Sequence, residues 1–153
     1  MGLTKVLYPS KIFLLRGDID FEKGSDVFKQ QLVDAQLGPQ TEEVFTGIFD
    51  AVEWFPLSAL LQDSVLVVHG GIGDGSWGLR ELASIQRPIK VRGNPPNLLA
   101  TVFQALTSNP ALSDATTGFR KDGAKSNETE FGQDVTANFC RLNRIKMIIR
   151  SNE

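Results

Sequence analysis

The chain has 153 residues, of which 41% are hydrophobic and 22% charged, so it is long enough to bury a core and has the composition of a globular domain. Its net charge of -2, without a basic run or an apolar stretch long enough to cross a bilayer, argues against nucleic acid and membrane as partners. The single cysteine, Cys140, excludes an internal disulfide framework and a cysteine-based zinc cluster, and it fits a cytoplasmic or nuclear location. His69 is the single histidine, whereas most metal and acid-base sites need more than one.

The first part of the chain is predicted to hold one strand and two helices. Residues 11–15 (KIFLL) form a short apolar run between a proline and a glycine, which is typical of a buried strand. The apolar residues within 21–37 suit a short amphipathic helix. Thr41 is expected to cap the next helix, in which apolar residues recur at i, i+4 and i+8. This spacing predicts a helix over residues 41–55 with its phenylalanine stripe in the core.

A β-hairpin is predicted next. Residues 57–61 and 64–69 have the composition of its two strands, with Gln62 and Asp63 at the bend. The second strand is apolar without alternation, so both of its faces are expected to be buried. The loop HGGIGDGSWG follows; it lacks the Lys-Ser/Thr ending of a nucleotide-binding P-loop, and its Trp77 either contacts a partner or folds back on the core.

The C-terminal part is predicted to hold three short helices, a surface loop and a final strand. Short helices are expected over residues 79–85 and 98–106. Residues 111–130 are rich in Ser, Thr, Asp, Asn, Gly and Lys and are predicted to be a mobile surface loop. A helix over 131–142, closed by Asn143 as C-cap, and a buried strand at 145–149 complete the chain.

Strands interspersed with helices predict a single α/β domain over residues 1–153. Three of the apolar runs are followed by a polar side chain that could reach a ligand: Asp18, His69 and Asn152. Ligands in open α/β sheets gather beyond the carboxyl ends of the strands. If the three strands are parallel neighbours, these side chains are therefore expected to converge.

The residue types at these strand ends leave alternatives open. Asp18 and Asp20 fit residual metal binding or turn chemistry, in which an aspartate bonds to its own backbone. An EF-hand loop is excluded because Lys23 and Lys29 occupy the positions of its required glycine and glutamate. His69 fits either a ligand or a core histidine bonded to the backbone.

Several motifs follow one another in a fixed order along the chain. They are YPSKIFLLRGDID, FTGIFDAVEWFPLSALLQDSVLVVHGGIG, LASIQRPI and DVTANFCRLNRIKMIIRSNE. They are similar to Y-P-x-x-x-x-L-L-R-G-N-H-E, to a phenylalanine-rich helix leading to H-G-G-(L/I), to I-x-R-P, and to a segment that ends in I-x-R-A-H-Q. The chain thus resembles the C-terminal part of the catalytic domain of serine/threonine protein phosphatases, the metal-dependent phosphoprotein phosphatase family with a calcineurin-like metallophosphoesterase fold.

The resemblance implies a partial metallophosphoesterase β-sandwich flanked by helices, with the N-terminal part of the domain missing. It also implies the family's chemistry, in which two divalent metal ions (Mn, Fe or Zn) hold a water that attacks a phosphoserine or phosphothreonine and neutralise the phosphate charge. The family's ligands come from five motifs: G-D-x-H-G, G-D-x-V-D-R-G, G-N-H-E, and the histidines of H-G-G and R-A-H.

The chain departs from this ligand set. The first two motifs do not occur in its sequence. The pattern N-H-E reads Asp18-Ile19-Asp20, in which Asp18 can still ligate but Ile19 replaces the histidine that protonates the leaving alcohol. His69 is retained, whereas Asn152 replaces a ligating histidine by a neutral amide, a poor ligand for a transition metal. Asp18, His69 and Asn152 are therefore expected to be a vestigial metal site that holds at most one ion, weakly, and no residue is assigned a catalytic role.

One arginine is a candidate for phosphate binding. The family's second phosphate-binding Arg-Gly is matched loosely by Asp122-Gly123, and an aspartate there would repel phosphate. Arg120 lies close enough in the sequence to substitute for it.

These observations favour a serine/threonine-phosphatase-like domain that is inactive as this chain. One alternative is a non-catalytic pseudophosphatase that binds a phosphoprotein or a phosphatase regulatory partner. Another is that these residues are a fragment of a longer, active phosphatase, in which case the lone chain is expected to expose one sheet face and to be poorly soluble or to dimerise.

Overall fold

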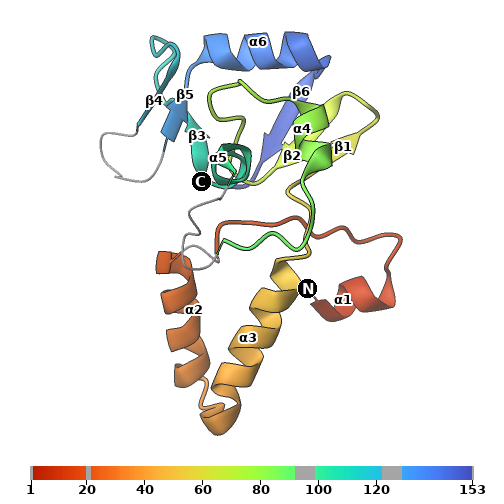
Figure 1. Ribbon diagram of the computed structural model, residues 1–153, viewed down its shortest axis with the longest axis vertical. Helices are drawn as coiled ribbons and strands as arrows, with labels where there is room; N and C mark the ends of the chain where they lie inside the picture. The colour runs from red at the N-terminus through yellow and green to blue at the C-terminus, as the bar shows by residue number, and fades with distance from the viewer. Residues whose placement is uncertain (1, 20–21, 92–98, 122–128, 153) are drawn as a thin grey trace.

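The computed structural model describes residues 2–19, 22–91, 99–121 and 129–152. Within them the fold is mixed α/β, with two small sheets and the helices around them at one end and a helical hairpin projecting from the other (Figure 1). The helices are α1 (Gly2–Leu7), α2 (Glu22–Asp34), the 3-10 turn η1 (Gly38–Gln40), α3 (Thr41–Val52), α4 (Leu79–Ser84), α5 (Ala100–Thr107) and α6 (Gln133–Asn143). The strands are β1 (Ser58–Leu61), β2 (Val65–Val68), β3 (Ser108–Pro110), β4 (Phe119–Lys121), β5 (Thr129–Phe131) and β6 (Met147–Arg150).

The first sheet has the strand order β1-β2-β6. β1 and β2 form the predicted antiparallel hairpin, and Gln62 and Asp63 turn the chain with φ angles of 48° and 52°. β6, the expected last strand with slightly shifted bounds, pairs with β2 in parallel, so that Val68 lies opposite Arg150. The C-terminal ends of β2 and β6 therefore meet at one edge of the sheet.

The second sheet corrects part of the prediction of a loop over residues 111–130, because β4 and most of β5 form within it, while residues 111–118 carry no helix or strand. β3, β5 and β4 pair in that order, with β5 parallel to β3 and antiparallel to β4. The polar composition favoured a loop, but Arg120 lies directly opposite Glu130 in the ladder, and opposite charges across a strand pair stabilise a short sheet. Residues 122–128 of the expected loop lie outside the described part of the chain.

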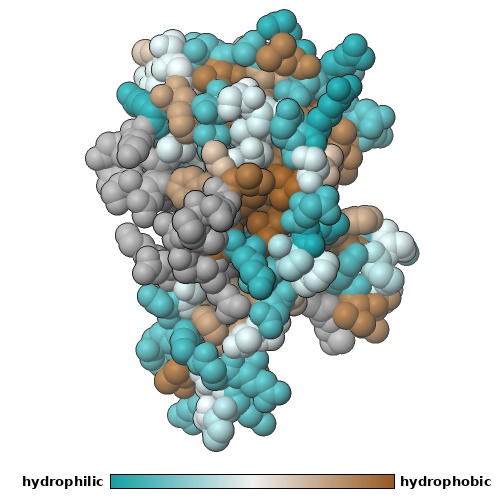
Figure 2. Space-filling model, viewed as in Figure 1, coloured by the Kyte–Doolittle hydropathy of each residue, from teal (hydrophilic) through white to brown (hydrophobic). Residues whose placement is uncertain are grey.

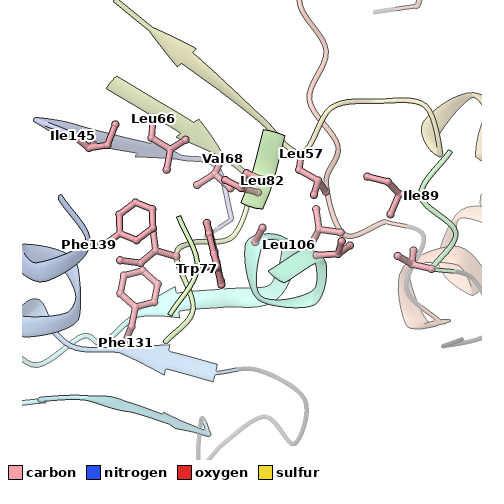
Figure 3. Close-up of a cluster of buried hydrophobic side chains, with 14 residues drawn as sticks. Leu57, Leu66, Val68, Trp77, Leu82, Ile89, Leu106, Phe131, Phe139 and Ile145 are labelled. Carbon is pink, nitrogen blue, oxygen red and sulfur yellow. The ribbon is translucent and has the colours of Figure 1, made fainter. Parts of the chain in front are cut away.

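The core is built from β2, β5 and helices α4, α5 and α6 (Figure 3). Trp77 folds back into it rather than facing outward: its ring lies edge-on to Phe139, 5.4 Å between centroids, and its Nε1 donates to Gln104 Oε1 at 2.7 Å. The buried cluster consists of Leu57, Leu66, Val68, Ile72, Trp77, Leu82, Ile89, Val91, Val102, Ala105, Leu106, Phe131, Phe139 and Ile145.

Helices α2 and α3 form the projecting hairpin, whose surface is mainly hydrophilic at its tip (Figure 2). The predicted phenylalanine stripe is buried only in part, because Phe49 packs against Phe28 and Phe45 in a small cluster between the two helices. Lys29 and Glu42 form an ion pair at 2.7 Å across the hairpin. Among the described residues, none of the helices has the length and apolar character that a transmembrane span requires.

Two of the predicted helix caps are wrong by one residue. Gln40 precedes α3, and Thr41 is its first helical residue, with Oγ1 donating to Gly38 O at 2.8 Å, because η1 runs directly into the helix with helical backbone angles. Arg144, with φ 58°, closes α6 in place of Asn143. Asn143 instead joins α6 to α4, since its Oδ1 accepts from the backbone N–H of Leu79 at 3.1 Å.

The predicted strand at residues 11–15 is not formed. The segment is extended but joins neither sheet in the described chain, and Phe13 is 74% exposed. It is held at its end by Arg16, whose backbone N–H donates to Pro56 O at 2.9 Å and whose buried guanidinium donates to Ile89 O. An apolar run becomes a strand only where a neighbouring strand can satisfy its backbone groups.

The expectation that both faces of β2 are buried holds for one face only. Leu66 and Val68 are buried at 1% exposure, whereas Val65 and Val67 are half-buried on the opposite face. The residues of β1 and β6 that pair with Val65 and Val67 are also apolar. We call this set the outer face of the first sheet: Ala59, Leu61, Val65, Val67, Met147 and Ile149.

Candidate functional site

The ends of β2 and β6 bring a cluster of polar side chains together. His69 directly follows β2, and Ser151 and Asn152 directly follow β6. The backbone N–H groups of Ser151 and Asn152 donate to His69 O at 3.3 and 3.0 Å, which extends the parallel register beyond the last paired residues. Asp18 reaches the same point from the extended segment after Arg16. Of the three predicted side chains, Asp18 and His69 therefore meet, although Asp18 comes from a segment that forms no strand, whereas Asn152 contacts His69 only through its backbone N–H.

Both nitrogens of the His69 imidazole make hydrogen bonds. Nε2 lies 3.1 Å from Asp18 Oδ1, and Nδ1 lies 2.9 Å from Ser151 Oγ. The hydrogen bond with His69 holds the pKa of the Asp18 carboxyl below its ordinary value, even though partial burial acts in the opposite direction. Asp18 is thus an ionised acceptor beside the ring.

Glycines set the position of the imidazole and of the chain behind it. A Cβ on Gly17 would lie 3.3 Å from His69 Cε1, so the ring rests against the glycine backbone. After His69, a Cβ on Gly70 would lie 2.6 Å from the carbonyl carbon of Leu106, and one on Gly71 would lie 2.4 Å from the ring of Phe131. These two glycines are therefore required by close packing, which gives the H-G-G motif a structural reason apart from any ligand.

The Asn152 side chain is hydrogen-bonded to the second sheet. Its Nδ2 donates to Asn109 Oδ1 at 3.1 Å, and the Arg150 guanidinium donates to the same oxygen. Arg150 Nε also donates to Gly70 O at 2.7 Å. This network ties β6 to β3 and thereby joins the two sheets beside His69.

Arg120, the candidate for phosphate binding, lies on β4 in the second sheet. Its Nε and Nη2 donate to Glu130 Oε2 at 3.0 and 2.9 Å. A phosphate would have to compete with this carboxylate, and phosphate binding by Arg120 stays a prediction.

The side chains around His69 do not fit the two-metal centre that the resemblance implies. Among the residues that the structure describes, His, Cys, Asp and Glu side chains form no group of three that could hold a metal ion. Asp18 and His69 are hydrogen-bonded to each other, and the neutral amide of Asn152 is hydrogen-bonded to Asn109. Asp20 lies outside the described residues. Since a bound divalent ion needs several donors converging on one point, the described side chains support no reaction step through a pair of metal ions.

Ser151 and Asn109 were not singled out from the sequence. Ser151 directly precedes Asn152 and stands where the family pattern R-A-H has an alanine. This replacement of an alanine by a serine is the sequence signal that could have pointed to Ser151. Asn109 lies in TSNP, on a strand that was not predicted. Its contact with Arg150 depends on how the two sheets pack, which no local pattern reveals.

Comparison with known proteins gives the class of this chain: it is a serine/threonine-phosphatase-like domain. Its fold resembles the structure of a protein serine/threonine phosphatase from Saccharomyces cerevisiae with similarity to human phosphatase PP5, with a TM-score of 0.77 and 25% identity, covering 99% of this chain and 44% of that one. The predicted partial α/β phosphatase fold is thereby confirmed. No protein-family model matches the chain.

Three curated relatives show the same similarity, and each is named as a serine/threonine-protein phosphatase. Serine/threonine-protein phosphatase T of Schizosaccharomyces pombe is 29% identical over 151 residues, which cover 97% of this chain and 30% of the relative. Serine/threonine-protein phosphatase 5 of Homo sapiens is also 29% identical, with 97% and 28% covered. Serine/threonine-protein phosphatase BSL2 of Arabidopsis thaliana is 26% identical, with 97% and 14% covered. The chain thus spans less than a third of the length of each of these relatives.

Proposed function

We propose that this phosphatase-like chain does not hydrolyse phosphoserine or phosphothreonine by itself. The proposal rests on the small set of possible metal donors at His69. This set has one imidazole and one carboxylate, that of Asp18, which are hydrogen-bonded to each other at 3.1 Å. Asn152 supplies an amide where the family pattern has a histidine. A metal-activated nucleophile and charge neutralisation at phosphate both require ligands that this set does not supply.

The expected loss of rate is large. Removing one preorganised donor to the transition state costs roughly 10²–10³-fold in rate. A general acid typically contributes about 10²–10⁴-fold, and Ile19 at the position of that acid has no proton to donate. Together with the altered metal ligands, these losses favour a rate indistinguishable from that of the uncatalysed reaction.

Phosphate release from a phosphoserine peptide tests this proposal directly. The full chain is assayed in excess Mn²⁺ beside a His69→Ala variant, whose folding is checked by circular dichroism. We expect the two proteins to give the same background rate. Turnover that the His69→Ala substitution abolishes would contradict the proposal.

A second candidate function is phosphoprotein binding without catalysis. It is favoured by Ile19 and Asn152, which depart from the motif positions even though the surrounding scaffold is kept. Under this hypothesis, chelator-treated chain is retained on an immobilised phosphopeptide and passes through the unphosphorylated control. Equal retention on both columns would count against it.

A third candidate is a segment of a longer phosphatase that is active as a whole. It is favoured by the relatives, of which the chain spans 14–30%. The coding sequence upstream of Met1 decides this point: G-D-x-H-G and G-D-x-V-D-R-G in frame would support it, and a stop codon directly upstream would exclude it.

A further inference from the structure

We propose that Ser151, His69 and Asp18 form a serine-nucleophile site that accepts an acyl group from an activated carboxylic ester. This activity is separate from phosphatase chemistry and needs no metal ligand. It rests on the function proposed above only in that metal ions must not occupy Asp18 and His69, and its test reports on Ser151 whether or not phosphate is released.

The geometry is that of a nucleophile, a base and a residue that orients the base. Ser151 Oγ lies 2.9 Å from His69 Nδ1, and Asp18 Oδ1 lies 3.1 Å from His69 Nε2. Both distances are within hydrogen-bond range, and the three side chains come from three separate segments of the chain. Such a constellation is recognised by its geometry and roles rather than by sequence order.

The direction of the hydrogen bonds follows from the chemistry of the groups. An ionised carboxylate only accepts, so His69 Nε2 carries the hydrogen that is donated to Asp18. In the neutral imidazole, Nδ1 then holds the lone pair, and Ser151 Oγ–H donates to it. This tautomer is the one in which the histidine can take the serine proton.

The nucleophile is accessible and its base is held in place. Ser151 is exposed at the end of β6, whereas the His69 side chain is only 19% exposed. The ring rests against the backbone of Gly17, which limits its movement. Ser151 also replaces the alanine of the family's R-A-H pattern, so its hydroxyl is a feature of this chain and not of that pattern.

The reaction consists of two balanced steps. Ser151 Oγ attacks the ester carbonyl carbon and forms a C–O bond, its proton passes to His69 Nδ1, and the ester C–O bond breaks as the alcohol leaves with that proton. Water then attacks the acyl-serine by the same route, which releases the carboxylic acid and restores the Ser151 hydroxyl. Asp18 stays ionised and orients the imidazole.

An alkyl fluorophosphonate probe tests the site without requiring turnover. The Ser151 oxygen would displace fluoride and gain a stable phosphonyl group. We expect one adduct on the full chain, located on the Met147–Glu153 peptide that cleavage after Lys146 releases. Ser151→Ala should abolish the adduct, and His69→Gln should slow its formation by about 100-fold, the scale of general-base assistance. The same variants should lower p-nitrophenyl acetate hydrolysis in parallel.

The control is Ser84→Ala, an exposed serine in α4 whose hydroxyl donates to Glu81 O outside the cluster, and this variant should label like the wild type. Thermal unfolding of each variant shows whether the chain remains folded. If the folded wild-type chain gains no adduct, or if the adduct persists in Ser151→Ala, the proposal is overturned. Labelling of Ser151 at an unchanged rate in folded Asp18→Asn and His69→Gln would also overturn it, because the hydroxyl would then react without the relay.

Discussion

At the scale of single residues, the contact between Gly17 and His69 decides where the imidazole lies. The ring is hydrogen-bonded to Asp18 through Nε2 and to Ser151 through Nδ1, and it lies close to the backbone of Gly17. A methyl group at position 17 would sit 3.3 Å from Cε1 and 3.4 Å from Nδ1, so the ring would have to move by a few tenths of an ångström to accept it. The hydrogen-bonded cluster therefore depends on a residue without a side chain.

We predict that Gly17→Ala lowers the free energy of unfolding by about 1 kcal/mol, because displacing the ring weakens its two hydrogen bonds. Urea denaturation followed by circular dichroism measures the change. The matched control is Gly47→Ala, at an exposed site in α3 where the added methyl meets no atom within 4 Å. Alanine there should raise stability by about 0.5–1 kcal/mol, since glycine is unfavourable inside a helix. If both variants gain stability, the close contact at His69 has no energetic weight.

At the scale of the elements, the β1–β2 hairpin turns on two residues in left-handed backbone conformation. Gln62 and Asp63 both have positive φ, and the N–H of Ser64 donates to Leu61 O at 3.1 Å to close the turn. Neither side chain favours this conformation as glycine does. The turn that positions β2, and with it His69, therefore carries a steric cost that glycine would avoid.

Asp63→Gly is expected to stabilise the chain by about 0.5–1 kcal/mol, because glycine adopts positive φ without the steric cost of a Cβ. The midpoint of urea unfolding should rise accordingly. Ser64→Gly, one residue further along, should instead destabilise, since it only adds freedom to the unfolded chain. Equal effects of the two substitutions would contradict the left-handed turn.

Local patterns predicted the elements whose signals are contained within one segment. The hairpin and α3 follow from apolar runs and helical spacing that a few residues carry by themselves. The pairing of β3 with β5 joins Asn109 to Glu130 across a long interval, and the run at 11–15 has no ladder partner in the described chain. These outcomes depend on tertiary contacts. Likewise, Asp18 and His69 were predicted from strand ends, whereas the role of Ser151 in holding the imidazole became visible only from the register of β6 against β2.

At the scale of the whole molecule, the outer face of the first sheet is apolar and open to solvent. Leu61, Met147 and Ile149 are 49%, 56% and 45% exposed there. Figure 2 shows further apolar side chains at the surface near the middle of the molecule. Adjacent exposed apolar side chains on a sheet favour association or limited solubility.

We predict that Met147→Lys combined with Ile149→Lys reduces concentration-dependent association, measured by sedimentation velocity over a range of protein concentrations. Charged side chains on this face oppose the burial that association would require. Leu112→Lys is the control, because Leu112 is fully exposed and lies outside the outer face. If Leu112→Lys reduces association as much as the double variant, added charge alone is responsible and the outer face has no special role.

The proposed lack of phosphatase activity depends on the small donor set around His69, and calorimetric titration of the full 153-residue chain with Mn²⁺ tests that set most directly. One imidazole and one carboxylate predict at most one weakly bound ion, with an affinity that Asp18→Asn and His69→Ala reduce further. Two tightly bound ions per chain, lost in those variants and accompanied by phosphate release from a phosphopeptide, would contradict it.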